Sequence, residues 1–144
     1  MPTPITCNED LRQLARKRVP RAIFEYVDRG SYDELTIRDN RAALDRLRLR
    51  QRVMIDVSAR STASTMLGKT VTMPVAVAPT GLTGLMHPDG EIHAARAAAA
   101  FGVPFALSTM SILSIEQVRA AVEWPFWFQL YVMRDRGFVA ELVQ

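Results

Sequence analysis

Apolar residues recur at helical spacing in the first part of the chain, and this pattern predicts two short helices. Asn8 would cap the first helix, and Pro20 would end it. The second helix would stop at Gly30, and helical spacing resumes at Leu44 and Leu47. The predicted apolar stripes consist of Leu11, Leu14 and Ala15 in the first helix and Ala22, Ile23, Tyr26 and Val27 in the second.

From residue 47 the spacing of the apolar residues changes from that of a helix to a repeat of two residues. Apolar and charged residues alternate as far as Val57, which is typical of a strand with one face in water. The apolar set is Leu47, Leu49, Val53, Ile55 and Val57, and the charged set is Arg46, Arg48, Arg50, Arg52 and Asp56. We interpret the arginine row as a solvated face, and contact with phosphate or a membrane surface is the alternative.

The rest of the chain alternates between strand and helix patterns. Apolar runs of strand length cover 74–78, 104–107 and 126–132, and the first of these has the composition of a strand covered on both faces. Helices are predicted at 91–100, closed by Gly102, after Ser114, which forms a capping-box spacing with Gln117, and along the stripe 138–143. The uncharged run 97–115 contains Gly102 and Pro104, so we predict a helix, a loop and a strand there rather than a membrane span.

Three successive strand–helix pairs indicate an α/β fold with a parallel sheet. A doubly wound nucleotide-binding fold would need a glycine fingerprint after the first strand, and the segment 79–84 has a different glycine spacing. We therefore favour the amino-terminal part of a (β/α)8 TIM barrel. In this interpretation 1–66 is a helical segment with one strand and 67–144 holds the first βα units. Because a full barrel needs about 250 residues, we expect an incomplete barrel with open strand edges or a partner chain.

Composition and charge narrow the classes of protein that fit this chain. Of its 144 residues 49% are hydrophobic and 23% are charged, as in an ordinary globular domain, which excludes a disordered protein. Cys7 is the only cysteine, so we expect a reducing, cytoplasmic location. A net charge of +3 with no basic stretch among aromatic residues argues against nucleic-acid binding. His87 and His93 lack the pattern of metal ligands, so we predict no metal site.

Candidate chemistry lies where the predicted strands end, because barrel enzymes build their active sites at the carboxyl ends of the strands. Those ends are 78–80, Ser108 with Thr109, and Gln129 with Tyr131. Polar residues also follow strands simply because loops are exposed to solvent. This explanation remains the alternative to a functional role at each strand end. Gln129 and Tyr131 lie two apart in a predicted strand and would share a side. An amide and a phenol on one side suit a polar ring system and a small oxygenated substrate.

Five segments resemble the FMN-dependent 2-hydroxy acid dehydrogenase and oxidase family, in the family's order and spacing. They are 20–30, 49–53, 78–81, 107–109 and 126–132. Within the family, residues 49–52 and 130–138 are most similar to bacterial L-lactate dehydrogenases that pass electrons to a quinone or a cytochrome. The resemblance covers nearly all of this chain but only the amino-terminal part of the family's chain.

The resemblance implies FMN as cofactor and assigns roles to particular residues. Tyr26 would donate its hydroxyl to the substrate carboxylate, and Tyr131 would hydrogen-bond the substrate near its reacting hydroxyl. The implied cofactor-binding residues are Ala78, Pro79 and Thr80, whose backbone would lie near flavin N5, and Ser108 and Gln129 at the isoalloxazine edge.

The resemblance further implies oxidation of L-lactate to pyruvate, with mandelate or glycolate as the alternative substrate. The family's catalytic histidine, its arginine clamp and a lysine come from later strands, so no catalytic residue is assigned in this chain. We therefore expect this chain to be part of a dehydrogenase and not to catalyse by itself. The competing interpretation is a truncated product that has no catalytic role. A quinone or cytochrome acceptor, a homo-oligomer of the full-length protein and contact of the 46–52 row with the inner membrane face are further implied possibilities.

Overall fold

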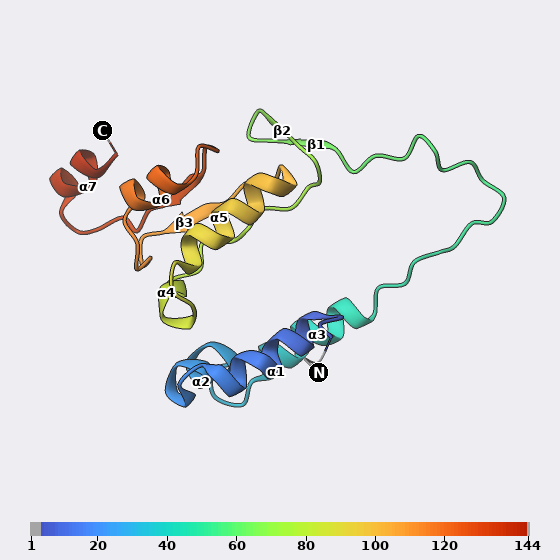
Figure 1. Ribbon diagram of the computed structural model, residues 1–144, viewed down its shortest axis with the longest axis horizontal. Coiled ribbons are helices and arrows are strands. Elements are labelled where there is room, and N and C mark those ends of the chain that lie inside the picture. The colour runs from blue at the N-terminus through green and yellow to red at the C-terminus, as the bar shows by residue number, and fades with distance from the viewer. Residues whose placement is uncertain (1–3, 144) are drawn as a thin grey trace. The chain divides into compact units, whose positions relative to one another are not determined.

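The computed structural model describes residues 4–143, which form two compact units that divide between Arg60 and Ser61 (Figure 1). The first unit contains α1 (Asn8–Arg18), α2 (Arg21–Asp28) and α3 (Leu35–Asp45). Both helices predicted before residue 30 are therefore confirmed. The helical spacing at Leu44 and Leu47 marks only the end of α3, and Leu47 lies outside it.

The start of α1 differs from the prediction by one residue. Cys7 is the N-cap, and Asn8 is the first helical residue. The reason is Asp10, whose Oδ2 accepts hydrogen bonds from the backbone N–H of Thr6 at 2.8 Å and of Cys7 at 3.1 Å. An acidic side chain at the third helical position thus supplies the acceptor at the helix start. The hydrogen bonds from Thr6 are the main reason that the pKa of Asp10 lies below its usual value.

An ion pair joins α1 to α2. The guanidinium of Arg12 forms two hydrogen bonds to the carboxylate of Asp28, with Nη2 2.9 Å from Oδ2. These bonds lower the pKa of Asp28. Because the pKa in the folded chain is below that of the unfolded chain, about 3.9, the pair stabilises the folded state above that pH and its contribution is lost as the pH falls through the folded value.

Replacing Asp28 with asparagine should therefore reduce stability at pH 7 and change it little at strongly acidic pH. Thermal unfolding followed by far-UV circular dichroism at both pH values measures the difference. Asp33→Asn is the matched control, since Asp33 is exposed and forms none of the ion pairs found among residues 4–143. An Asp28→Asn effect of the same size at both pH values would contradict the role of this ion pair.

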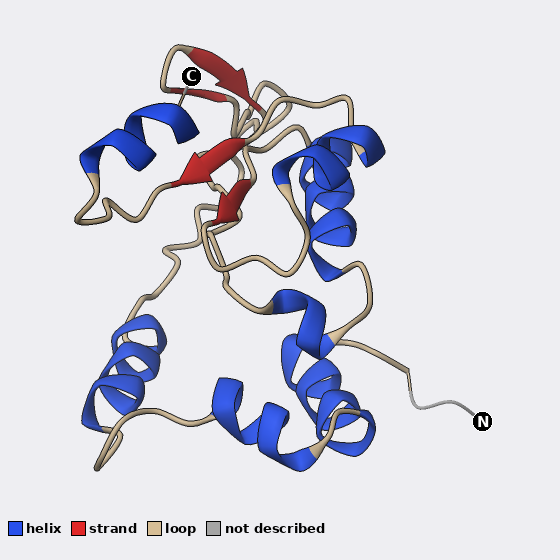
Figure 2. Cartoon of the chain, turned by 90° about the vertical axis from the view of Figure 1, so that its left-hand side faces the viewer, coloured by secondary structure: helices blue, strands red, loops and turns tan. Residues whose placement is uncertain are grey.

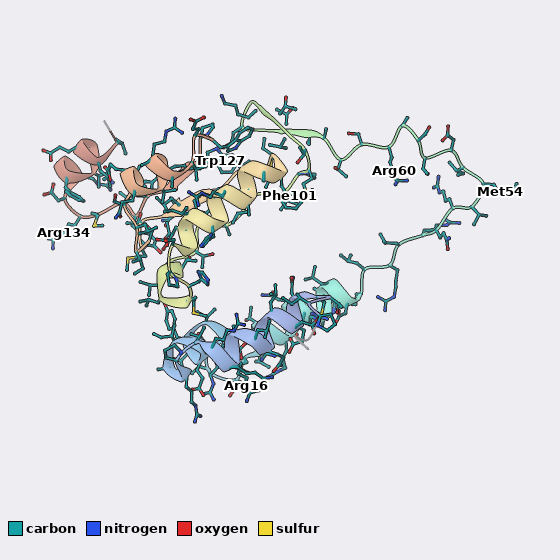
Figure 3. All side chains as sticks on the ribbon, viewed as in Figure 1. Arg16, Met54, Arg60, Phe101, Trp127 and Arg134 are labelled. Atoms are coloured by element: carbon teal, nitrogen blue, oxygen red, sulfur yellow. The ribbon has the colours of Figure 1, made fainter. Side chains whose placement is uncertain are left out.

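The strand predicted from 47 to 57 is wrong. Residues 46–60 form no strand, and their side chains are exposed, including Leu49 and Met54 at 102% each. Figure 3 shows the segment running through Met54 to Arg60 with side chains projecting from it. A period of two describes an extended backbone, but a strand also needs a neighbour with which to exchange hydrogen bonds. The left-handed backbone at Met54, with φ of 57°, also interrupts the extended conformation.

The second unit begins with an antiparallel hairpin that the sequence pattern did not predict. β1 (Ser64–Met66) pairs with β2 (Lys69–Val71), with Thr65 opposite Thr70. The connecting residues Leu67 and Gly68 have φ of 46° and 75°. Two successive positive φ values are those that a two-residue turn of the hairpin type requires.

Three parallel segments follow the hairpin, in the order that the sequence predicted but shorter, and two of them are long enough to be drawn as strands (Figure 2). β3 (Ala106–Ser108) pairs with β4 (Trp127–Gln129), with Leu107 opposite Phe128. The predicted strand 74–78 is reduced to a single bridge between Val77 and Phe105. That strand was expected to be covered on both faces, but Val75 is 53% exposed. It has a hydrogen-bonded neighbour on one side only among the described residues, which explains its short length.

Helices α4 (Thr83–Met86), α5 (Gly90–Phe101), α6 (Ile115–Ala121) and α7 (Arg136–Leu142) complete the second unit. α5 and α6 confirm the prediction, and their ends match the predicted signals. Gly102 ends α5 in the left-handed conformation, with φ of 68°. At the start of α6 the backbone N–H of Gln117 donates to Ser114 Oγ at 3.3 Å, and that of Ser114 donates to Gln117 Oε1 at 2.8 Å.

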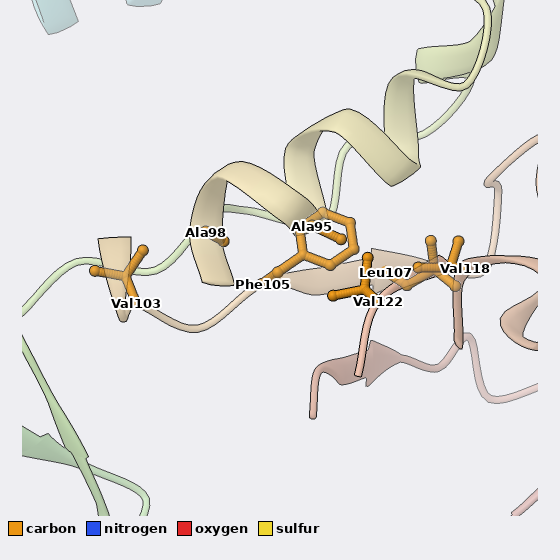
Figure 4. Close-up of a cluster of buried hydrophobic side chains, with 7 residues drawn as sticks. All are labelled: Ala95, Ala98, Val103, Phe105, Leu107, Val118 and Val122. Carbon is orange, nitrogen blue, oxygen red and sulfur yellow. The ribbon is translucent and has the colours of Figure 1, made fainter. Parts of the chain in front are cut away.

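A single hydrophobic cluster joins β3 to α5 and α6 (Figure 4). Leu107 and Val118 are 1% and 0% exposed. Alanines on α5 leave room for the bulkier side chains around them. The buried members are Ala95, Ala98, Val103, Phe105, Leu107, Val118 and Val122. Across residues 4–143 no helix is both long and apolar enough to span a lipid bilayer.

Candidate functional site

The carboxyl ends of the three parallel segments lie at one edge of the sheet. Val77 pairs with Phe105 in parallel, and Ser108 pairs with Gln129 at the last position of β3 and β4. Neighbouring strands lie about 4.8 Å apart, so the two outer ends are separated by about 10 Å. This distance is close to the length of a tricyclic ring system. The structure thus brings Ala78, Ser108 and Gln129 to one edge, as the sequence predicted.

The loop after the first of these segments packs against the loop after β3. Ala78, Pro79 and Thr80 are exposed. The N–H of Leu82 donates to the carbonyl of Met110 at 2.9 Å. A Cβ atom at Gly81 would lie 3.0 Å from the Cβ of Met110, so only glycine fits here without a shift of the neighbouring backbone. Residues 78–80 are therefore exposed and are followed by a closely packed turn.

Ser108 and Gln129 present different chemistry at this edge. Ser108 is 3% exposed, and its Oγ accepts the N–H of Met110 at 3.0 Å. A hydroxyl that accepts one bond still has its own proton to donate. Gln129 is half-buried at the end of β4, and its side-chain amide carries both a donor and an acceptor. The two side chains together carry both a donor and an acceptor, and Ser108 is the more covered of the two.

Thr109 connects the ends of β3 and β4, a role that the sequence analysis missed. Its N–H donates to the carbonyl of Gln129 at 3.1 Å, and its hydroxyl donates to the same carbonyl. The same hydroxyl oxygen accepts the N–H of Tyr131 at 3.1 Å. A threonine directly after the strand run was the available signal, since a β-branched hydroxyl residue there can bond to the neighbouring backbone.

Tyr131 lies outside the strand in which the sequence placed it. β4 ends at Gln129, so the argument that Gln129 and Tyr131 share a side by strand alternation is wrong. The chain leaves the sheet because its backbone bonds at this point go to Thr109 rather than to a neighbouring strand. Tyr131 is 53% exposed.

Tyr26 lies on α2 in the first unit and is 69% exposed. The sequence pattern placed Tyr26 on the apolar face of this helix, and this placement is wrong. Phe24 is the buried residue of α2, at 8% exposure. The aromatic ring without a hydroxyl takes the covered position, and the phenol of Tyr26 is left in contact with solvent.

The neighbourhood of the strand ends shows no metal-ligand geometry. His87 and His93 are exposed, and their rings contact each other edge to face with centroids 5.2 Å apart. Throughout residues 4–143, no group of three His, Cys, Asp or Glu side chains is placed to hold a metal ion. The polar groups at this edge are backbone amides, hydroxyls and one carboxamide, which suit an organic ligand.

The sequence model of one protein family, described as FMN-dependent dehydrogenase, matches residues 15–144. The chain belongs to the FMN-dependent dehydrogenase family. Among curated members, the L-lactate dehydrogenase of Caulobacter vibrioides is 50% identical over 139 residues, covering 96% of this chain and 36% of that protein. The L-lactate dehydrogenase of Xanthomonas campestris is 47% identical over 140 residues, covering 97% of this chain and 36% of its own length.

Solved structures of two mandelate enzymes share the α/β fold of this chain. A soluble mutant of the membrane-associated (S)-mandelate dehydrogenase from Pseudomonas putida is 39% identical, with a TM-score of 0.84 over 94% of this chain and 40% of that one. A mandelate oxidase is 36% identical, with a TM-score of 0.87 over 97% of this chain and 40% of its own. The chain thus spans 36% of the length of the curated relatives reported above.

Proposed function

We propose that this chain is the amino-terminal, flavin-facing part of a (β/α)8-barrel enzyme that oxidises L-lactate to pyruvate with FMN. The meeting of three parallel strand ends at one edge carries the proposal, because barrel enzymes place their active sites there. The choice of L-lactate as substrate rests on sequence identity. The L-lactate dehydrogenases described above are 47–50% identical to the chain, and the mandelate enzymes are 36–39% identical. Mandelate or glycolate is the alternative substrate.

The residues at the sheet edge fit a flavin ring. In this proposal, the backbone of the exposed residues Ala78, Pro79 and Thr80 lies against the ring near N5, and the Ser108 hydroxyl and the Gln129 amide bond its polar edge. Bound FMN would supply a two-electron acceptor for the hydride equivalent that leaves Cα of the hydroxy acid. Ser108 and Gln129 would hold the ring at one position along the strand ends, because strand pairing holds the two residues opposite each other.

Two tyrosines are proposed to bind and orient the substrate. Tyr26 would donate its hydroxyl to the substrate carboxylate, which lowers the free energy of binding. Tyr131 would donate a hydrogen bond near the reacting hydroxyl, which orients the Cα–H bond. We assign the general base, the carboxylate-clamping arginine and the flavin-facing lysine to residues outside 1–144. Arg134 and Arg136 flank Asp135, the N-cap of α7, and receive none of these roles.

The proposal extends to partners and location. A quinone or a cytochrome would reoxidise the flavin, and the full-length protein would be a homo-oligomer. Contact with the inner face of the membrane would give access to a quinone. The arginine row 46–52 is fully available for such a contact, because its side chains are exposed. Release of the protein from sedimented anionic vesicles by high salt is the measurement that would support this contact.

A chimera tests the function. Residues 1–144 would replace the matching part of the Caulobacter vibrioides L-lactate dehydrogenase, which is 50% identical over that part. We expect the purified chimera to bind FMN and to reduce an artificial acceptor with L-lactate faster than with (S)-mandelate or glycolate. The unaltered dehydrogenase is the control. A folded chimera that binds no FMN, or that prefers mandelate, would contradict the proposal or its choice of substrate.

The 144-residue chain by itself provides a second test. With added FMN and L-lactate under anaerobic conditions, we expect the flavin absorbance to stay that of the oxidised form, because removal of the general base alone costs about 10²–10⁴ in rate. Bleaching at a rate near that of a complete dehydrogenase would show that the base lies within residues 1–144.

A further inference from the structure

Glu91 is a buried carboxylate to which neither the fold nor the proposed function has yet given a role. It lies in the first turn of α5 and is 2% exposed. A carboxylate is buried only where hydrogen bonds or charges compensate for its lost hydration. The start of α5 provides part of this compensation, because the helix dipole places positive potential at its amino end.

Further compensation comes from two backbone N–H groups, one in α4 and one in the loop after β3. Glu91 Oε1 accepts the backbone N–H of Gly84 at 3.2 Å and that of Ile112 at 3.0 Å. Gly84 follows the segment that ends at Ala78, and Ile112 follows β3. One oxygen atom therefore bonds both connecting loops, the one after the first parallel segment, which contains α4, and the one after β3.

The two loops approach each other closely at this point. A Cβ atom at Gly84 would lie 2.8 Å from the Cβ of Ile112, a distance at which the backbone would have to shift. The hydrogen bond from Leu82 to Met110 is a second link between the same loops. Glu91 thus bonds the same two connecting loops that the hydrogen bond from Leu82 to Met110 joins.

We propose that Glu91 is a positioning residue that fixes the distance between the two loops proposed to face the flavin. The inference rests on the proposed function only for its effect on FMN; the clamp itself follows from the hydrogen bonds. Glu91 Oε2 is buried and has no hydrogen-bond partner within residues 4–143. Replacing Oε2 with an amide nitrogen therefore removes no hydrogen bond of the clamp, so Glu91→Gln is the conservative variant.

Three variants of the 144-residue chain test the clamp. Glu91→Gln keeps the Oε1 acceptor, Glu91→Leu removes it at similar volume, and Glu91→Asp keeps the charge but shortens the side chain. Glu123→Leu is the control, because Glu123 is exposed in the same unit. Amide hydrogen exchange measured by NMR should rise about tenfold or more at Gly84 and Ile112 in the Leu and Asp variants. It should stay near the wild-type rate in the Gln variant and in the control.

The pattern of exchange separates positioning from general destabilisation. Faster exchange confined to the two loops, with Leu107 and Val118 unchanged, supports the clamp. Equal acceleration at Leu107 and Val118, or a Gln variant as disturbed as the Asp variant, would overturn it. If Glu91→Leu does not fold, the comparison of Asp with Gln decides.

The affinity of the chain for FMN is measured in a titration that monitors the quenching of flavin fluorescence. We expect binding about tenfold weaker in Glu91→Asp and within about twofold of wild type in Glu91→Gln. Unchanged FMN affinity in an Asp variant whose loops exchange faster would refute the link between the clamp and the flavin. If the wild-type chain binds no FMN, that result counts against the proposed function, and the exchange rates still decide the role of Glu91.

Discussion

Leu107→Ala should unfold most of the second unit at denaturant concentrations that the wild-type chain withstands. Leu107 is 1% exposed at the centre of β3 and belongs to the cluster that joins α5 and α6. Truncating a buried leucine costs about 2–5 kcal/mol, the sum of lost transfer free energy and an unfilled cavity. The total stability of a small domain is about 5–15 kcal/mol, so the loss is a large part of the whole.

Urea unfolding followed by tryptophan fluorescence measures this effect, because Trp124 and Trp127 both lie in the second unit. Leu67→Ala is the matched control, since Leu67 is 82% exposed in the hairpin turn. We expect the control to change the free energy of unfolding by less than about 0.5 kcal/mol. Equal urea midpoints for the two variants would show that the cluster around Leu107 does not stabilise the second unit.

Tyr131→Phe should lower kcat for L-lactate about 10- to 100-fold in the chimera described above. A hydrogen bond to a charged or reacting group is worth about 1.5–3 kcal/mol, and each 1.36 kcal/mol is tenfold in rate. Because Tyr131 is proposed to act at the reacting hydroxyl, the loss should fall mainly on kcat. Tyr26→Phe should instead raise KM, because Tyr26 is proposed to bind the carboxylate, which has the same charge before and during the reaction.

Tyr32→Phe is the matched control for both tyrosines. Tyr32 is 103% exposed and belongs to the loop before α3, and no role is proposed for it. Steady-state kinetics with L-lactate and an artificial acceptor measure kcat and KM for each variant. An unchanged kcat in Tyr131→Phe would remove Tyr131 from the proposed site. A fall in kcat without a rise in KM for Tyr26→Phe would reassign Tyr26 from the carboxylate to the reacting centre.

Local signals predicted α5 and α6 well, whereas the short helix α4 was not predicted. The capping-box pair Ser114 and Gln117 and the terminal Gly102 act through hydrogen bonds and backbone angles within a few residues, so their meaning changes little with the surroundings. The parallel order of the strands followed from the same helices, because a helix between two strands returns the chain to the same end of the sheet.

Features that depend on distant neighbours were predicted poorly. The alternation from 47 to 57 indicated a strand, but no segment pairs with it among residues 4–143. The hairpin at 64–71 was missed although Gly68 follows Leu67 at its turn, because the strands on either side are short and mostly polar. Tyr26 was placed on the covered face of α2, and only packing shows that Phe24 takes that position.

The sequence by itself determined the order of the parallel segments and where α5 and α6 begin and end, because caps, glycines and apolar periods act over a few residues. It also carried the family resemblance, since the family model matches residues 15–144. Only the tertiary structure decided the register that sets Ser108 beside Gln129, the link through Thr109 and the Glu91 clamp. Those depend on contacts between residues far apart in the chain, whose partners no local pattern specifies.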